Sequence, residues 1–146
     1  MEELIKMLDE NLDYVAHEIQ DEYILITVTA NRKELICPRC NTPSSKVHSC
    51  YPRKFQDLPI QGKKVYIVIE NRKMFCKNPK CEHKTFAESF SFLPRNGKRT
   101  MRLEEEIVKI SLTCSSLTAS KLLSARVANI GKTAICRLLK KRQSRN

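Results

Sequence analysis

Two pairs of cysteines could hold a metal ion. Cys37 and Cys40 lie in the tight turn CPRC, and Cys76 and Cys81 lie in the slightly wider turn CKNPKC. Each turn can direct two sulfur atoms toward one tetrahedral centre, which is how structural Zn2+ is held by four thiolates. The sequence between the turns is long enough for an antiparallel hairpin that would bring them together. The pattern predicts one structural zinc ion, bound by Cys37, Cys40, Cys76 and Cys81.

Other ligand sets and other uses of these thiols stay open. His48, Cys50 and His83 compete as ligands, because a histidine can replace a thiolate. Four free thiols in an apolar core fit poorly with flanking Pro, Arg, Asn and Lys, which do not favour burial. A redox pair usually opens a helix after a strand, whereas Pro43 and Ser44 follow CPRC. The four-cysteine metal site is the preferred interpretation.

The total number of cysteines also favours a metal over disulfides. The chain has seven cysteines, an odd number, and shows no secretory signal. Cys114 and Cys136 fall at apolar-leaning positions of predicted helices, where a free cysteine is usually a small buried hydrophobe. The longest apolar stretches are far shorter than the roughly 20 residues of a membrane span. We therefore expect a soluble, cytoplasmic protein without a membrane partner.

Charge is distributed unevenly along the chain. The net charge is +11, but residues 1–30 carry eight acids and one base, which gives −7. Residues 31–146 carry the other eight acids and 26 bases, which gives +18. Such a surplus favours a polyanionic partner, most often nucleic acid. The alternative is a basic protein whose charge serves only solubility.

The elements that position these residues predict an α+β fold. Residues 2–9 predict a short helix with Leu4, Ile5 and Leu8 on one face. Strands are expected at 14–19, 23–30, from Val47 onward and over 65–75, and we expect a small antiparallel sheet carrying the zinc site. The predicted domains are an acidic N-terminal helix with strands leading into the zinc domain (1–33), a zinc-binding β domain (34–94), a helix-turn-helix (95–142) and a basic tail (143–146). The boundary between the zinc-binding domain and the helices is expected near residues 93–99.

Three helices are predicted after Thr100. The first places Leu103, Ile107, Ile110 and Leu112 at helical spacing, and a Ser-rich joint separates it from the second. The second helix holds four residues of mixed polarity: Thr118, Ser120, Leu122 and Leu123. The segment RVANIGKT, with Gly131, supplies a turn before a final basic helix. Three short helices with this turn resemble a helix-turn-helix.

The final helix is the candidate DNA-reading element. Ile135, Leu138 and Leu139 are expected to face inward. The outer side then carries the candidate DNA-binding residues, of which the last three would lie near phosphates: Lys132, Thr133, Cys136, Arg137, Lys140, Lys141 and Arg142. A charged, solvated terminal helix is the alternative. Further bases on the predicted sheet indicate phosphate contact in general: Arg53, Lys54, Lys63, Lys64, Arg72, Lys73, Lys77, Lys80 and Lys84.

These motifs resemble a known family. The run CPRC, then VHSCYPRKFQDLPIQGKKVYIVIENRKMFCKNPKC and EHKTFAE, resembles the N-terminal zinc-binding domain of ISL-three-type insertion-sequence transposases. The later LPRNGKRTMRLEEEI and IGKTAICRLLKK look like the helix-turn-helix of the same family. The resemblance covers about residues 34–142. It implies zinc ligation by the same four cysteines, without Cys50, and fold-keeping roles for His48, Asp57, Leu58 and Phe86.

The resemblance also implies a function. Family members bind the terminal inverted repeats of a mobile element through these two modules, ahead of a nuclease domain whose acids hold two metal ions. The adjacent Glu104, Glu105 and Glu106 cannot all converge on one metal pair, so we expect no enzyme activity from this chain. The expectation is a truncated transposase DNA-binding region, associated with the bacterial nucleoid. Expected partners are double-stranded DNA and a second copy or a full-length transposase. The alternative is a zinc-stabilised protein adaptor or a transcriptional regulator.

Overall fold

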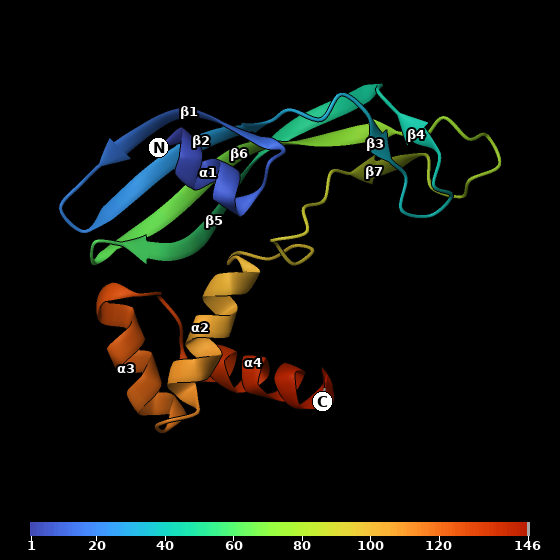
Figure 1. The fold of residues 1–146 in the computed structure, drawn as a ribbon. Coiled ribbons are helices and arrows are strands. Elements are labelled where there is room, and N and C mark those ends of the chain that lie inside the picture. The colour runs from blue at the N-terminus through green and yellow to red at the C-terminus, as the bar shows by residue number, and fades with distance from the viewer. Residues whose placement is uncertain (146) are drawn as a thin grey trace.

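A five-stranded sheet and a bundle of three helices make up most of the chain (Figure 1). The computed structural model describes residues 1–145, apart from the side chains of residues 125, 126 and 145. In chain order the elements are α1 (Glu2–Leu8), β1 (Leu12–Ile19), β2 (Tyr23–Ala30), β3 (Leu35–Ile36), β4 (Pro43–Ser44), β5 (Val47–Ile60), β6 (Lys63–Phe75), β7 (Thr85–Ala87), α2 (Met101–Ser111), α3 (Ser116–Arg126) and α4 (Lys132–Arg145). The α+β class is as predicted.

The sheet is mixed, so the prediction of a purely antiparallel sheet is wrong. Its strand order is β1-β2-β6-β5, with β7 beside the end of β6. The β1–β2 and β5–β6 hairpins are antiparallel, but β2 pairs with β6 in parallel. The reason is that β2 and β6 belong to different hairpins, so their relative direction is set by tertiary packing and not by a local turn. Strand β6 buries alternate residues along most of its length and lies inside the sheet, whereas the first six residues of β5 are exposed and β5 lies at the edge.

One face of the sheet forms the main core. Ile26, Ile67 and Phe55, each at most 2% exposed, pack there with residues of the segment that leaves β7. Helix α1 covers part of this face through Ile5, which is buried, and Leu8, which is partly buried. Leu4, expected on the same face, is instead exposed. The acidic N-terminal segment therefore belongs to the same core as the basic hairpin that follows.

The three C-terminal helices have a core of their own. Thr100 caps α2 and Ser115 caps α3, because each hydroxyl accepts a hydrogen bond from a backbone N–H in the first turn of its helix. The predicted Ser-rich joint therefore ends one helix and begins the next. Leu103, Ile107 and Leu123 are fully buried between the helices. Leu112, predicted at helical spacing with these apolar residues, is instead mostly exposed, and so is Leu122 of α3.

The segment expected to separate the two parts of the chain is fixed to the sheet. Gln56 of β5 donates its backbone N–H to the carbonyl of Lys98 (2.8 Å) and accepts from the N–H of Thr100 (2.9 Å). Helix α4 includes residues 143–145 of the predicted basic tail, and residue 146 lies outside the described residues. No helix in the described part of the chain is both long enough and apolar enough to cross a membrane.

Candidate metal centre and basic surfaces

The first cysteine turn is shaped by the short strands β3 and β4. These strands pair antiparallel, and the N–H of Cys37 donates to the carbonyl of Thr42 (3.1 Å). Asn41 adopts a left-handed conformation (φ 58°) and donates its N–H to the carbonyl of Cys37 (2.9 Å). Asparagine tolerates this conformation better than most residues. The turn therefore closes tightly and points the sulfurs of Cys37 and Cys40 to one side.

The second cysteine turn follows β6 and is built around Asn78. The Asn78 side-chain oxygen accepts from the N–H of Lys80 (3.0 Å), and its carbonyl accepts from the N–H of Cys81 (3.1 Å). Pro79 suits the second position of such a turn, because its φ is already fixed near the required value. The turn is closed at its base by the N–H of Cys76, which donates to the carbonyl of Lys84 (2.8 Å).

The two turns bring the four predicted cysteines into one cluster. All four sulfur atoms lie within 4.8 Å of one another. The Sγ atoms of Cys40 and Cys76 are 3.5 Å apart, and those of Cys37 and Cys81 are 4.0 Å apart. Tetrahedral Zn2+ with bonds of about 2.3 Å would separate its sulfur ligands by about 3.8 Å. The donor set and its spacing are therefore consistent with one structural zinc ion.

The surroundings of the sulfurs favour a thiolate at one position and oppose it at another. Hydrogen bonds from the Thr42 hydroxyl and backbone lower the pKa of the Cys40 thiol to about 6. The backbone of Asn78 also favours the Cys76 thiolate, but burial and the neighbouring cysteines outweigh it and raise the pKa of Cys76 to about 12. Several thiolates so close together repel one another, and a divalent cation among them removes that penalty.

The competing ligands lie away from this cluster. His83 and Cys50 are exposed, and the ring of His48 packs against Phe75, with 4.8 Å between centroids. Among the described residues, the four cysteines are the one group of three or more His, Cys, Asp or Glu side chains close enough to share a metal ion.

A small apolar core supports the cluster. Leu35, Met74 and Phe86 are buried together with Cys37. Phe86 was expected to keep the fold, whereas sequence reasoning missed Leu35 and Met74. Each lies two residues before a cysteine, on a strand that enters a turn. That spacing puts them on the same side of the strand as the following cysteine and is the signal that could have identified them.

The predicted DNA-binding residues of α4 differ in their surroundings. Lys132, Thr133, Arg137 and Lys140 are exposed. Cys136 is half-buried, with its sulfur 3.5 Å from the hydroxyl of Ser116 on α3. Ile135 and Leu138 are buried and Leu139 is partly buried, as predicted.

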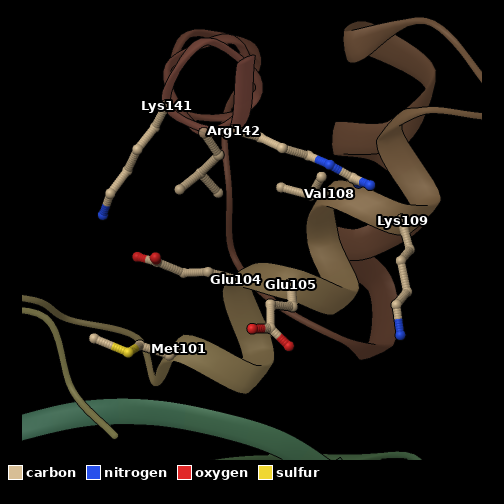
Figure 2. Close-up of a pocket in the computed structure, with 8 residues that line it drawn as sticks. Met101, Glu104, Glu105, Val108, Lys109, Lys141 and Arg142 are labelled. Atoms are coloured by element: carbon tan, nitrogen blue, oxygen red, sulfur yellow. The ribbon is translucent and has the colours of Figure 1, made fainter. Parts of the chain in front are cut away.

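Lys141 and Arg142 instead line a groove between α4 and α2 (Figure 2). The groove has a volume of about 380 Å3 and an apolar floor that includes Val108. Figure 2 shows Glu104 of α2 pointing toward the side of Lys141, and Glu105 also lines the groove. Lys141 and Arg142, which are also exposed, therefore share this groove with two carboxylates.

Several basic side chains of the sheet make hydrogen bonds or ion pairs within the chain. Arg72 donates to Glu88 (2.8 Å), whose side chain is fully buried and also accepts from Arg32. Arg53 donates to the carbonyls of Pro94 (3.2 Å) and Gly97 (3.1 Å). Lys63 and Lys64 also make hydrogen bonds within the chain, and Lys73 is half-buried. The members of the predicted set that are exposed are Lys54, Lys77, Lys80 and Lys84.

Comparison with known proteins assigns the segment that contains the cluster. Residues 33–81, which include all four cysteines, match the family described as the zinc-finger of transposase IS204/IS1001/IS1096/IS1165. No curated protein and no solved structure matches the chain. The family match ends at Cys81, before α2 begins. Together, the match and the geometry of the cluster identify residues 33–81 as a zinc ribbon of the ISL3-family transposase type.

Proposed function

We propose that this chain binds double-stranded DNA at the terminal inverted repeats of a mobile element. The transposase-type zinc ribbon suggests a role related to transposition. The proposal adds a reading element, the pair α3 and α4 with the turn between them, acting as a helix-turn-helix. In such motifs the second helix enters the major groove and its N-terminal residues meet base edges.

The observation that carries the proposal is the outer face of α4. Thr133, Arg137 and Lys140 are exposed there at helical spacing, and the whole helix contains no acidic residue. An α-helix with its side chains is about 10–12 Å across, which fits the roughly 12 Å width of the major groove. Arginine can pair with guanine through two hydrogen bonds, while lysine adds attraction to phosphates.

Removing the two cations of this face tests the proposal. The double substitution Arg137→Ala and Lys140→Ala is expected to weaken binding at least tenfold. It should also reduce the slope of log K against log salt by about 0.9 for each phosphate that the variant no longer neutralises. Affinity is measured by fluorescence anisotropy across a salt series, with inverted-repeat and scrambled duplexes of equal length.

Lys109→Ala is the matched control, because Lys109 is exposed but lies on α2 at the groove that also holds Glu104 and Glu105. It should leave both affinity and slope nearly unchanged. Equal affinity of the intact protein for the two duplexes would contradict recognition of inverted repeats. Equal effects of the control and the double substitution would contradict the role assigned to the outer face of α4.

A further inference from the structure

The zinc ribbon and the helical bundle lie at opposite ends of one long β-hairpin. Strands β5 and β6 pair from Val47↔Met74 at the ribbon end to Ile60↔Lys63 at the other. Figure 1 shows the ribbon strands β3, β4 and β7 at one end of this hairpin and α3 near the other, with α2 and α4 beside α3. Ten residue steps along β5 separate Val47 from Asp57, which joins the helices. The bulge between Val47 and Ser49 makes the same span nine steps on β6, so at about 3.3 Å per residue the separation is about 30–33 Å.

The helical end of the hairpin is joined through a buried carboxylate. Asp57 is 4% exposed and accepts from the hydroxyl of Thr100 (2.8 Å) and from Arg102, whose Nε lies 2.8 Å away. A second nitrogen of Arg102 pairs with the other carboxylate oxygen. A planar guanidinium held by both oxygens of one carboxylate has a fixed orientation. The start of α2 is therefore fixed relative to β5.

A second set of contacts joins the hairpin to the turn before α4. The side-chain amide of Gln56 donates to the carbonyl of Val127 (3.2 Å). Asn129 accepts from Lys64 (2.6 Å) and donates to the hydroxyl of Tyr66 (3.3 Å). With attachments at α2 and before α4, the bundle is restrained from turning about a single joint.

The ribbon end is fixed to the same hairpin. The N–H of Phe75 on β6 donates to the carbonyl of Lys46 (2.9 Å), and β7 extends the sheet beside β6. Met74 of β6 is fully buried against Cys37 and Phe86. Exposed bases surround this end of the molecule: Arg39, Lys46, Lys77, Lys80 and Lys84. Each end of the hairpin thus carries a basic surface.

We infer that the β5–β6 hairpin is a rigid spacer that sets the ribbon and α4 about one turn of B-DNA apart. One turn is about 34–36 Å, and the hairpin holds the ribbon and the base of the helical bundle about 30–33 Å apart. Two contacts separated by one turn meet the same side of a duplex, so both can form without bending it. The inference rests on the proposed function and adds its geometry: the target contains two contacted segments centred about 10 base pairs apart. Asp57, Arg102 and Gln56 are positioning residues in this arrangement.

The spacing is tested on a duplex selected from a random-sequence pool by the zinc-loaded full chain. Hydroxyl-radical footprinting of the bound duplex should show two protected blocks about 10 base pairs apart on one side. Inserting 5 base pairs between the blocks turns the second block to the opposite side, and affinity should fall at least tenfold. The spacer inference is overturned if the insertion changes affinity by less than twofold. It is also overturned if the footprint shows a single protected block.

Loosening the joint tests the rigidity separately from DNA. Arg102→Gln removes the cation but leaves the buried Asp57 a partner in Thr100, and Gln56→Ala removes the contact to Val127. In the intact protein, residual dipolar couplings from residues 33–87 and 101–144 should fit one alignment tensor. In the double variant the couplings of the two segments should require two different alignment tensors. The loss of affinity caused by the 5-base-pair insertion should also become at least threefold smaller.

Lys6→Gln is the matched control for this experiment, because it breaks the Lys6–Asp13 ion pair (2.6 Å), which lies in the N-terminal segment and not at the joint. The couplings of this variant should still fit one alignment tensor, and the 5-base-pair insertion should still lower its affinity at least tenfold. Two tensors in the intact protein overturn the spacer even if DNA is bound. Failure to select any duplex overturns the proposed function and the spacer with it.

Discussion

Replacing Cys37 with serine is expected to abolish both zinc binding and the fold of the ribbon. Cys37 is fully buried, its sulfur lies 4.0 Å from that of Cys81, and it packs in the apolar core with Leu35 and Met74. Structural zinc sites in small domains contribute about 10–16 kcal/mol of apparent binding free energy, which is also folding free energy. Zinc content should fall from near one ion per chain to near zero, as measured by mass spectrometry of the purified protein.

The same variant should lose the dispersed amide resonances of residues 33–87 in a two-dimensional NMR spectrum. Chelation of zinc from the unsubstituted protein should cause the same loss. Cys50→Ser is the matched control, because Cys50 is exposed on β5 and outside the cluster. It should keep one zinc ion and a native spectrum. A Cys37→Ser protein that retains one zinc ion and folds normally would contradict the assignment of Cys37 as a ligand.

The cysteine cluster was predictable from sequence because its signal is local. Two residues separate Cys37 from Cys40, and Pro79 and Asn78 mark the second turn, so each pair of ligands is fixed within a few residues. The helices were predictable for a similar reason, since Thr100 and Ser115 are capping residues directly before them, and Leu103, Ile107 and Ile110 recur at helical spacing in α2. Where neighbouring residues determine the geometry, composition and spacing carry enough information.

The sheet order was not predictable in the same way, because it depends on contacts between distant strands. Sequence patterns predicted the two hairpins but not that β2 would pair with β6 in parallel. The sequence also predicted the surroundings of the α4 side chains only in part. Helical periodicity separates Ile135 from Thr133, but it does not reveal that α2 brings Glu104 and Glu105 beside Lys141 and Arg142. These features are set by the packing of elements, which a periodic pattern does not encode.

The joint between the sheet and the helices illustrates the same limit. The family resemblance implies a fold-keeping role for Asp57, but its partners Thr100 and Arg102 lie more than forty residues away. The residues next to Asp57 on β5 do not predict that Thr100 and Arg102 are its hydrogen-bond partners. The segment from Pro94 to Arg99 has the composition of a linker, yet Arg53 and Gln56 hold it against the sheet. A Pro- and Gly-containing segment can thus be a fixed connection instead of a flexible one.

Deleting residues 1–30 is expected to unfold the sheet, and not simply to remove an acidic surface. Strand β2 lies inside the sheet beside β6, and its Ile24, Ile26 and Val28 are at most 5% exposed. Burial of each such side chain contributes about 1.5–3 kcal/mol, so these three contribute roughly 5–9 kcal/mol. Domains are typically stable by only about 5–15 kcal/mol. The truncated chain should lose its cooperative thermal transition, as measured by circular dichroism at about 218 nm.

A charge-neutralised variant separates the acidic charge of this segment from its structural role. Glu2, Glu3, Asp21 and Glu22 are all exposed, so their replacement by Gln or Asn removes four negative charges without touching the core. This variant should keep the thermal transition and bind DNA more tightly at low salt, because fewer acids repel the phosphates. A truncated chain that still unfolds cooperatively would show that β5 and β6 do not need β2. Loss of folding in the neutralised variant would instead show that the acids stabilise the basic hairpin directly.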